Sequence, residues 1–171
     1  MKCILQRAKE EGEEVYEKAK EIIDEGKARG SLTLKGFEKE VEAGGRRHVV
    51  KVIDGEAVEE DRDGRKLLRI RITAEVDGVR RDFTITYGWY GDDNEARGFA
   101  YARADAPGGR EADAERLAAA IEALTGVKPK VYRKSDGDIE IVCGKTHLEG
   151  FMRYTELADA IKKWLEETSR Q

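Results

Sequence analysis

Six residues of this sequence have side chains that suit contact with a nucleic acid. Arginine and lysine bind phosphate oxygens, and tyrosine stacks on nucleobases. Each falls on the polar side of a segment that alternates like a strand, so we expect all six on one sheet face, opposite its apolar side. The set is Arg69, Arg71, Arg103, Lys130, Tyr132 and Lys134. Glu75 and Glu140 fall on the same side, which leaves open a charged surface that only faces solvent.

Histidine and cysteine chemistry has little support in the sequence. His48 and His147 have no Cys, His, Asp or Glu partner at the spacing of a metal site. Cys143 ends an expected strand, and no basic residue adjacent in sequence would activate it, so we expect a buried thiol. The sequence contains no GxSxG, HExxH or P-loop pattern. We therefore expect no catalytic residue, no metal site and no cofactor.

An acidic loop offers an alternative. Asp92, Asp93 and Glu95 fall within four residues of one another, and clustered carboxylates can hold Mg²⁺ for phosphoester cleavage. A solvated turn is the commoner role of such a cluster. The metal-dependent nuclease stays an alternative to simple binding.

The last third of the chain supplies the elements that would position these residues. Residues 98–104 alternate like a strand, and Ala114, Leu117, Ile121 and Leu124 form a helical stripe that ends at Gly126. A hairpin follows, with Lys128, Lys130, Tyr132 and Lys134 on one side and a tight turn at Asp136-Gly137. Thr146 and Glu149 predict a capping box for one closing helix that runs to residue 168.

The middle of the chain predicts more sheet. Residues 66–89 form the clearest hairpin, with Asp77-Gly78 as a type I′ turn between two alternating runs. Residues 48–53 read as a strand. Residues 31–42 fit either a helix or a strand with a bulge at Gly36, and a hairpin across Gly44-Gly45 favours the strand.

The N-terminal segment, residues 3–28, has apolar and glycine residues at spacings of three and four, which predicts a long helix. Its seam could dock on the domain or pair with a second copy, so homo-oligomerisation or another protein interaction through this helix is an alternative function. We divide the chain into this helix, residues 1–29, and an α+β domain, residues 30–171.

Composition narrows the class of protein. Charged residues make up 40% of the chain, the net charge is −4, and the only amides are Asn94, Gln6 and Gln171. Abundant charge with few amides is typical of heat-adapted proteins. The two cysteines are far apart, and no segment has the length and apolarity of a membrane span. We expect a cytoplasmic protein without membrane contact.

Four stretches, residues 30–42, 71–79, 104–118 and 147–168, resemble the PaRep paralogous family of hyperthermophilic crenarchaea (Pyrobaculum type). That family implies little about function. From residue 80 onward, the order strand–strand–helix–strand–strand–helix is similar to half of a LAGLIDADG homing endonuclease, in which helices cover one sheet face and the other face grips DNA. The acidic metal-binding helix of those enzymes has no counterpart before Phe83, so this resemblance implies sheet-face binding.

Together these observations predict an α+β fold: a long N-terminal helix, a meandering antiparallel sheet, then a β-α-β-β-α unit with its helices on one sheet face. The function that we favour at this stage is non-enzymatic binding of DNA or RNA through the polar, basic sheet face.

Overall fold

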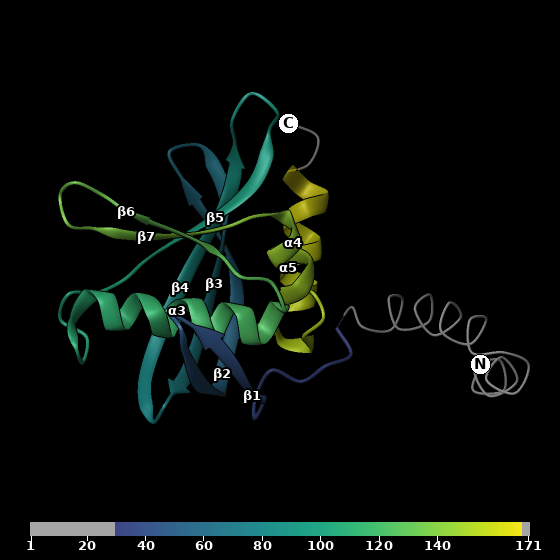
Figure 1. Ribbon diagram of the computed structural model, residues 1–171. Coiled ribbons are helices and arrows are strands. Elements are labelled where there is room, and N and C mark those ends of the chain that lie inside the picture. Colours follow the sequence, from purple (N-terminus) through teal and green to yellow (C-terminus); the bar gives the residue numbers. More distant parts are fainter. Residues whose placement is uncertain (1–29, 169–171) are drawn as a thin grey trace, which may run out of the picture.

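The computed structural model describes residues 30–168, and nearly half of them lie in strands. Seven strands form one antiparallel sheet in the order β1-β2-β3-β4-β5-β7-β6 (Figure 1). Their bounds are β1 Glu38–Ala43, β2 Arg46–Arg62, β3 Arg65–Val76, β4 Val79–Tyr90, β5 Glu95–Tyr101, β6 Lys130–Arg133 and β7 Ile139–Cys143. The described residues also form three helices, α3 Gly109–Thr125, α4 Lys145–Phe151 and α5 Thr155–Thr168. None of these helices is long and apolar enough to cross a membrane.

The sheet begins as a meander because its first four strands are joined by two-residue turns. Gly44-Gly45, Asp63-Gly64 and Asp77-Gly78 each have positive φ at both positions, as a type I′ turn requires. The predicted turns at Gly44-Gly45 and Asp77-Gly78 are confirmed. The hairpin at Asp63-Gly64 was missed, and β2 has 17 residues where a strand was expected only over residues 48–53.

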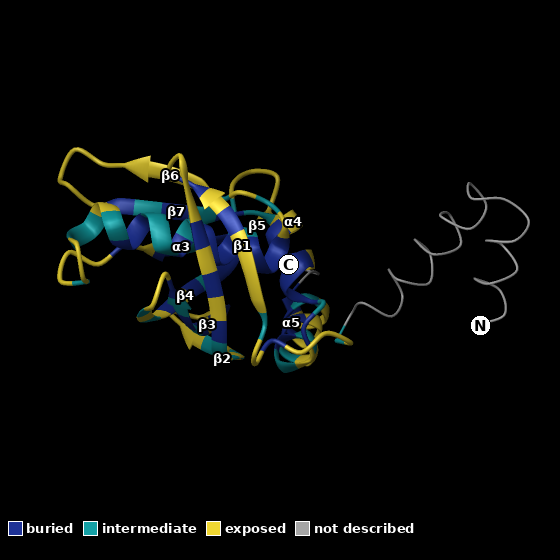
Figure 2. Ribbon diagram, turned by 60° about the horizontal axis from the view of Figure 1, so that its bottom comes forward, coloured by how far each residue is buried: buried dark blue, intermediate teal, exposed yellow. Residues whose placement is uncertain are grey.

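The sheet curls into a half-barrel, so that α3 contacts both β1 near one edge and β7 near the other. One face of β3, of β4 and of the first part of β2 is apolar, and the curl turns these faces toward α3 and α5. Trp164 of α5 and Tyr87 of β4 are among the largest buried side chains. Figure 2 shows buried and exposed residues alternating along β2, whereas β6 at the sheet edge is exposed along its length.

The segment before β1 is held by α5 and β2. Glu156 accepts the backbone N–H groups of Leu34 and Lys35, each at 2.9 Å. Leu34 is fully buried and reaches the bulged part of β2, where a Cβ on Gly55 would lie 2.2 Å from its Cδ2. A side chain at position 55 would therefore displace Leu34 from this close approach.

The predicted single closing helix is two helices. Between α4 and α5, Met152 O and Arg153 O accept the N–H groups of Gly30 and Leu32 at 2.8 and 2.9 Å, and Thr155 N–H donates to Leu32 O at 2.7 Å. A continuous helix needs these backbone groups for its own hydrogen bonds. The docked residues 30–32 therefore interrupt it.

The predicted fold layout is wrong. The described chain is mostly one curled seven-stranded sheet, a half-barrel with three helices, and all seven strands belong to this single sheet. The long N-terminal helix was expected over residues 3–28, which lie outside the described residues. Of residues 31–42, only 38–42 are in a strand.

Two smaller expectations are also wrong. Glu95, which was expected in the acidic loop with Asp92 and Asp93, is the first residue of β5. The N-cap of α4 is Gly144, whose N–H donates to His147 Nδ1 at 3.0 Å, so Thr146 and Glu149 do not form the expected capping box.

Candidate nucleic-acid interface

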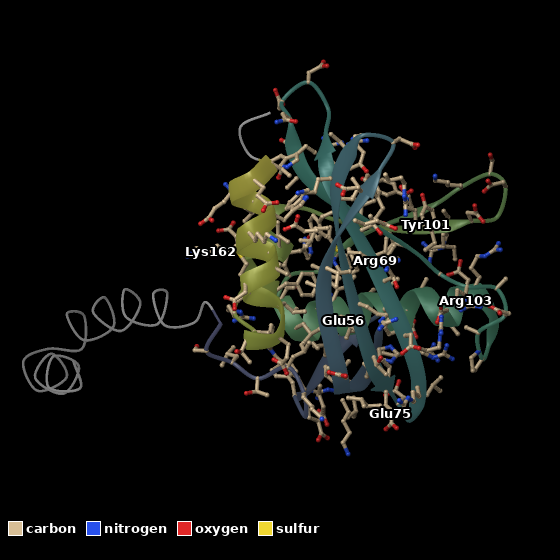
Figure 3. The ribbon with its side chains drawn as sticks, turned by 180° about the vertical axis from the view of Figure 1, so that it is seen from behind. Glu56, Arg69, Glu75, Tyr101, Arg103 and Lys162 are labelled. Carbon is tan, nitrogen blue, oxygen red and sulfur yellow. The ribbon has the colours of Figure 1, made fainter. Side chains whose placement is uncertain are left out.

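The outer face of the sheet, away from the helices, carries the residues predicted to bind nucleic acid. Strand register places Lys130 on β6 and Arg69 on β3 in one cross-strand row, with Val142, Phe99 and Thr86 between them. At about 4.8 Å per strand, the row spans roughly 19 Å. The sheet therefore brings residues from distant parts of the chain onto one surface, which Figure 3 shows from outside.

The three arginines of the predicted set all have carboxylate partners. Arg71 lies 2.6 Å from Glu56 and Arg103 lies 2.9 Å from Asp105, while Arg69 is 3.9 Å from Glu60. These neighbours offset the arginine charges. The β3 end of the outer face is thus mixed in sign.

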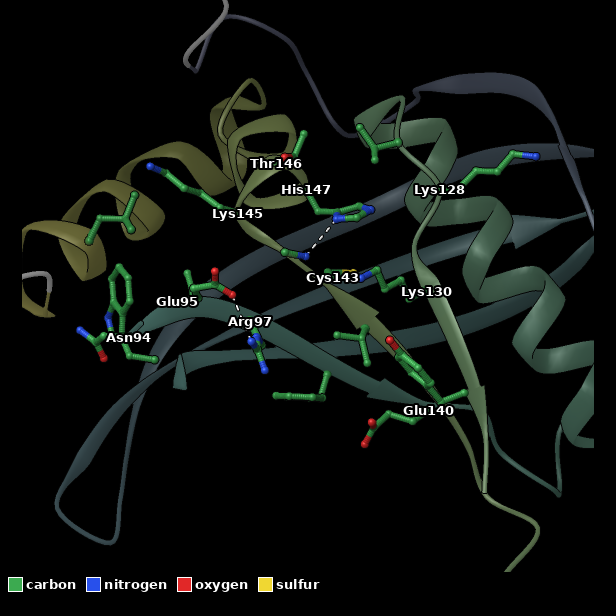
Figure 4. Close-up of a pocket in the computed structure, with 18 of the residues that line it drawn as sticks. Asn94, Glu95, Arg97, Lys128, Lys130, Glu140, Cys143, Lys145, Thr146 and His147 are labelled. Atoms are coloured by element: carbon green, nitrogen blue, oxygen red, sulfur yellow. Dashed lines mark hydrogen bonds and ion pairs between the residues drawn. The ribbon is translucent and has the colours of Figure 1, made fainter. Parts of the chain in front are cut away.

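The end of the same face that carries the predicted lysines forms a groove. Lys130, Tyr132 and Lys134 line a groove of about 1070 Å³ that lies over β5, β7 and β6 and reaches the start of α4 (Figure 4). Its charged lining consists of Arg97, Lys128, Lys130, Lys134 and Lys145 against Glu95 and Glu140. The structure therefore divides the predicted set into a lysine groove and a separate group of paired arginines.

Both groove carboxylates are already engaged. Glu95 pairs with Arg97 at 3.1 Å. Glu140 lies 3.3 Å from Lys134 Nζ and accepts the Tyr101 hydroxyl at 2.7 Å, a hydrogen bond that raises the pKa of Tyr101 to about 12. Each carboxylate thus neutralises one groove cation.

Three lysines remain in excess. Lys128, Lys130 and Lys145 are exposed, and none forms an ion pair with another residue of the described chain. Figure 4 shows Lys145 on the opposite side of the groove from Lys128 and Lys130. A groove with surplus positive charge on both sides favours an anionic ligand.

Tyr132 is the exposed aromatic side chain of the groove. It is 48% exposed and lies two residues from Lys130 and from Lys134, on the same side of the chain. Its ring and hydroxyl contact no other ring, cation or hydrogen-bond partner among residues 30–168. Phe99, in contrast, packs edge-on against Tyr90 at 5.1 Å. The Tyr132 ring is therefore available to a ligand.

Sequence reasoning missed part of this groove. Lys128 was placed on the correct side of its strand but outside the predicted set, although its two-residue spacing from Lys130 gave the signal. Arg97 and Lys145 were also outside the predicted set. Only the pairing of β5 with β7 brings both beside Lys130.

The remaining candidates have structural roles. Cys143 is fully buried, which raises the pKa of its thiol to about 12, as expected for an inert thiol. His147 is also buried; burial lowers its pKa, and its Nδ1 accepts the Gly144 N–H at the start of α4.

His48 connects the β1–β2 hairpin to its surroundings. Its Nδ1 lies 2.5 Å from Asp77 Oδ2, and its Nε2 lies 3.0 Å from Ala43 O and 3.1 Å from Glu115 Oε2. Burial acts to raise the pKa of Asp77, but the Val49 N–H and His48 stabilise the carboxylate and the pKa is lowered overall. The network joins the sheet to α3.

Asp92 and Asp93 lie in the exposed β4–β5 turn. Within residues 30–168, no group of three or more His, Cys, Asp or Glu side chains is placed to hold a metal ion.

Comparisons with protein-family models, with curated proteins and with solved structures found no match. The resemblances to the PaRep family and to a LAGLIDADG half-domain stay predictions from the sequence.

Proposed function

We propose that this protein binds nucleic acid without cleaving it, through the lysine groove over β5, β7 and β6. The observation that carries the proposal is the surplus of three exposed lysines in a groove of about 1070 Å³ whose carboxylates are both paired. Phosphate contacts by lysine supply the sequence-independent part of nucleic-acid affinity. The net charge of −4 means that attraction must come from this local site.

The test is binding to labelled DNA and RNA over a salt series. We expect the logarithm of the association constant to fall linearly with the logarithm of salt concentration, because each neutralised phosphate releases counterions. Changing Lys128, Lys130 and Lys145 together to Ala should weaken binding at low salt. It should also reduce the slope by roughly 2–3, at about 0.7–0.9 per lost phosphate contact.

A matched control changes Arg69, Arg71 and Arg103 together to Ala. It removes an equal number of positive charges, three, from the same outer face, but from side chains that already face carboxylates. We expect a smaller loss of affinity than in the lysine variant. Absence of binding at low salt, or equal losses in the two variants, would contradict the lysine groove as the binding site.

A further inference from the structure

The groove contains a second kind of contact besides charge. Tyr132 exposes 48% of its surface and is flanked by Lys130 and Lys134. Covering an exposed aromatic ring with a planar group is favourable, because it removes a large apolar surface from water and allows stacking. A ligand with a planar group to cover the ring and anionic groups to pair with the lysines would fit both the exposed ring and the positive charge.

From this geometry we propose that the ligand is single-stranded nucleic acid, with an unpaired base stacked on Tyr132 and the adjoining phosphates on Lys128, Lys130 and Lys145. The inference rests on the proposed function. Alternation of exposed aromatic and basic side chains along a strand is how sheet surfaces bind single strands, because every base offers a stacking face. In a duplex the base faces are already stacked on one another, so they are not accessible to Tyr132.

The neighbouring aromatic side chains support Tyr132 as the base contact. The hydroxyl of Tyr101 is held by Glu140, and Lys134 Nζ lies over its ring, 5.7 Å from the centroid. Phe99 is half-buried and in edge contact with Tyr90. Among the aromatic residues that line the groove, Tyr132 thus combines high exposure with an uncovered ring within the described chain.

The experiment compares oligonucleotides that have equal numbers of phosphates. Oligothymidine, oligouridine, an abasic DNA strand and a duplex are titrated with the full-length protein, with Tyr132→Leu and with Tyr132→Phe. Because one base stacked on one aromatic ring accounts for that much affinity, Tyr132→Leu should weaken binding of the two single strands by roughly 5- to 150-fold. Tyr132→Phe keeps the ring and should bind as the unchanged protein does.

The abasic strand and the duplex provide the controls, since both present phosphates without accessible base faces. We expect both to bind more weakly than the single strands and to be insensitive to Tyr132→Leu. Oligothymidine and oligouridine together show whether the site distinguishes DNA from RNA, and the inference holds if either strand shows the Tyr132 dependence.

Two results would overturn the inference, and they differ in what they mean for the groove. Equal, salt-dependent binding of abasic, duplex and single-stranded probes, unchanged in Tyr132→Leu, would refute base stacking and leave phosphate binding by the groove intact. No binding of any probe at low salt would refute the proposed function together with this inference.

Discussion

A buried ion pair between Asp113 of α3 and Arg81 of β4 links the helix to the sheet. Asp113 is fully buried and accepts from Arg81 Nε at 2.6 Å, from Arg81 Nη2 at 3.1 Å and from the Arg103 N–H at 2.8 Å. The Arg81 side chain is only 12% exposed. Both charges lose contact with water on folding, and the attraction between them compensates for that loss.

Replacing Asp113 with Ala should lower the free energy of unfolding by about 3–5 kcal/mol, the usual cost of leaving one buried charge without its partner. The variant also leaves the Arg103 N–H without its acceptor. The measurement is chemical denaturation followed by circular dichroism, with the midpoint and the slope fitted separately, so that a change in stability is distinguished from a change in compactness.

The same helix offers a control with nearly identical geometry. Glu111 accepts hydrogen bonds from Arg133 Nε at 2.7 Å and from Arg133 Nη2 at 2.8 Å. In this pair, however, the Glu111 side chain is 64% exposed and the Arg133 side chain is 61% exposed. Glu111→Ala should leave the denaturation midpoint almost unchanged, because water screens an exposed pair and solvates each partner alone.

A double-mutant cycle completes the test. Arg81→Ala combined with Asp113→Ala should cost less than the sum of the two single changes, by about 0.5–3 kcal/mol, because the double variant removes both members of the Arg81–Asp113 pair instead of leaving one of them buried alone. Arg116, which is 11% exposed and lies 3.7 Å from Asp113, is the same in Asp113→Ala and in the double variant. Two results would contradict this reasoning: Asp113→Ala shifts the midpoint no more than Glu111→Ala does, or the effects of Arg81→Ala and Asp113→Ala on the unfolding free energy simply add. Either would mean that burial does not increase the contribution of this pair to stability.

Three further predictions concern the core and the turns. Asp77→Asn preserves the turn residue type, and because the pKa of Asp77 is lowered in the folded protein, its carboxylate stabilises the fold above the unfolded pKa of about 4. The difference in unfolding free energy between the two proteins should therefore shrink as pH falls from 6 to 2, and a constant difference would contradict it. Gly98→Ala places a Cβ 2.6 Å from Tyr87 Cε2, and overpacking should lower the free energy of unfolding by about 1–3 kcal/mol in denaturant titrations; an unchanged free energy would contradict this close packing. In a Cys3→Ser background, Cys143 should resist a thiol reagent at pH 8 until denaturant is added, since its pKa is raised to about 12; rapid labelling of the folded protein would disprove its burial.

Local patterns predicted the elements that local chemistry controls. The Asp77-Gly78 hairpin was predictable because both positive φ values suit its residues and both flanking runs alternate. The helix ending at Gly126 was predictable from its apolar stripe and its C-terminal glycine, which has φ 78°. The Asp63-Gly64 hairpin was not, because much of β2 beyond Asp54 is charged on both faces and shows no apolar alternation.

The candidate site was partly predictable for the same reason. Alternation placed Lys130, Tyr132 and Lys134 on the polar side of a strand, and their exposure agrees with that placement. It could not show that Arg69 and Arg71 face Glu60 and Glu56, since this depends on the register of β2 against β3.

The sequence by itself determined which residues alternate, where the glycine and Asp-Gly turns lie, and which strand faces are polar, because these properties depend on neighbours within a few positions of the chain. Tertiary structure decided the rest. The curl of the sheet around α3, the break between α4 and α5 and the pairing of β5 with β7 all join segments separated by tens of residues. The lysine groove arises from that pairing, which sets Arg97 and Lys145 beside Lys130, and no local pattern specifies it.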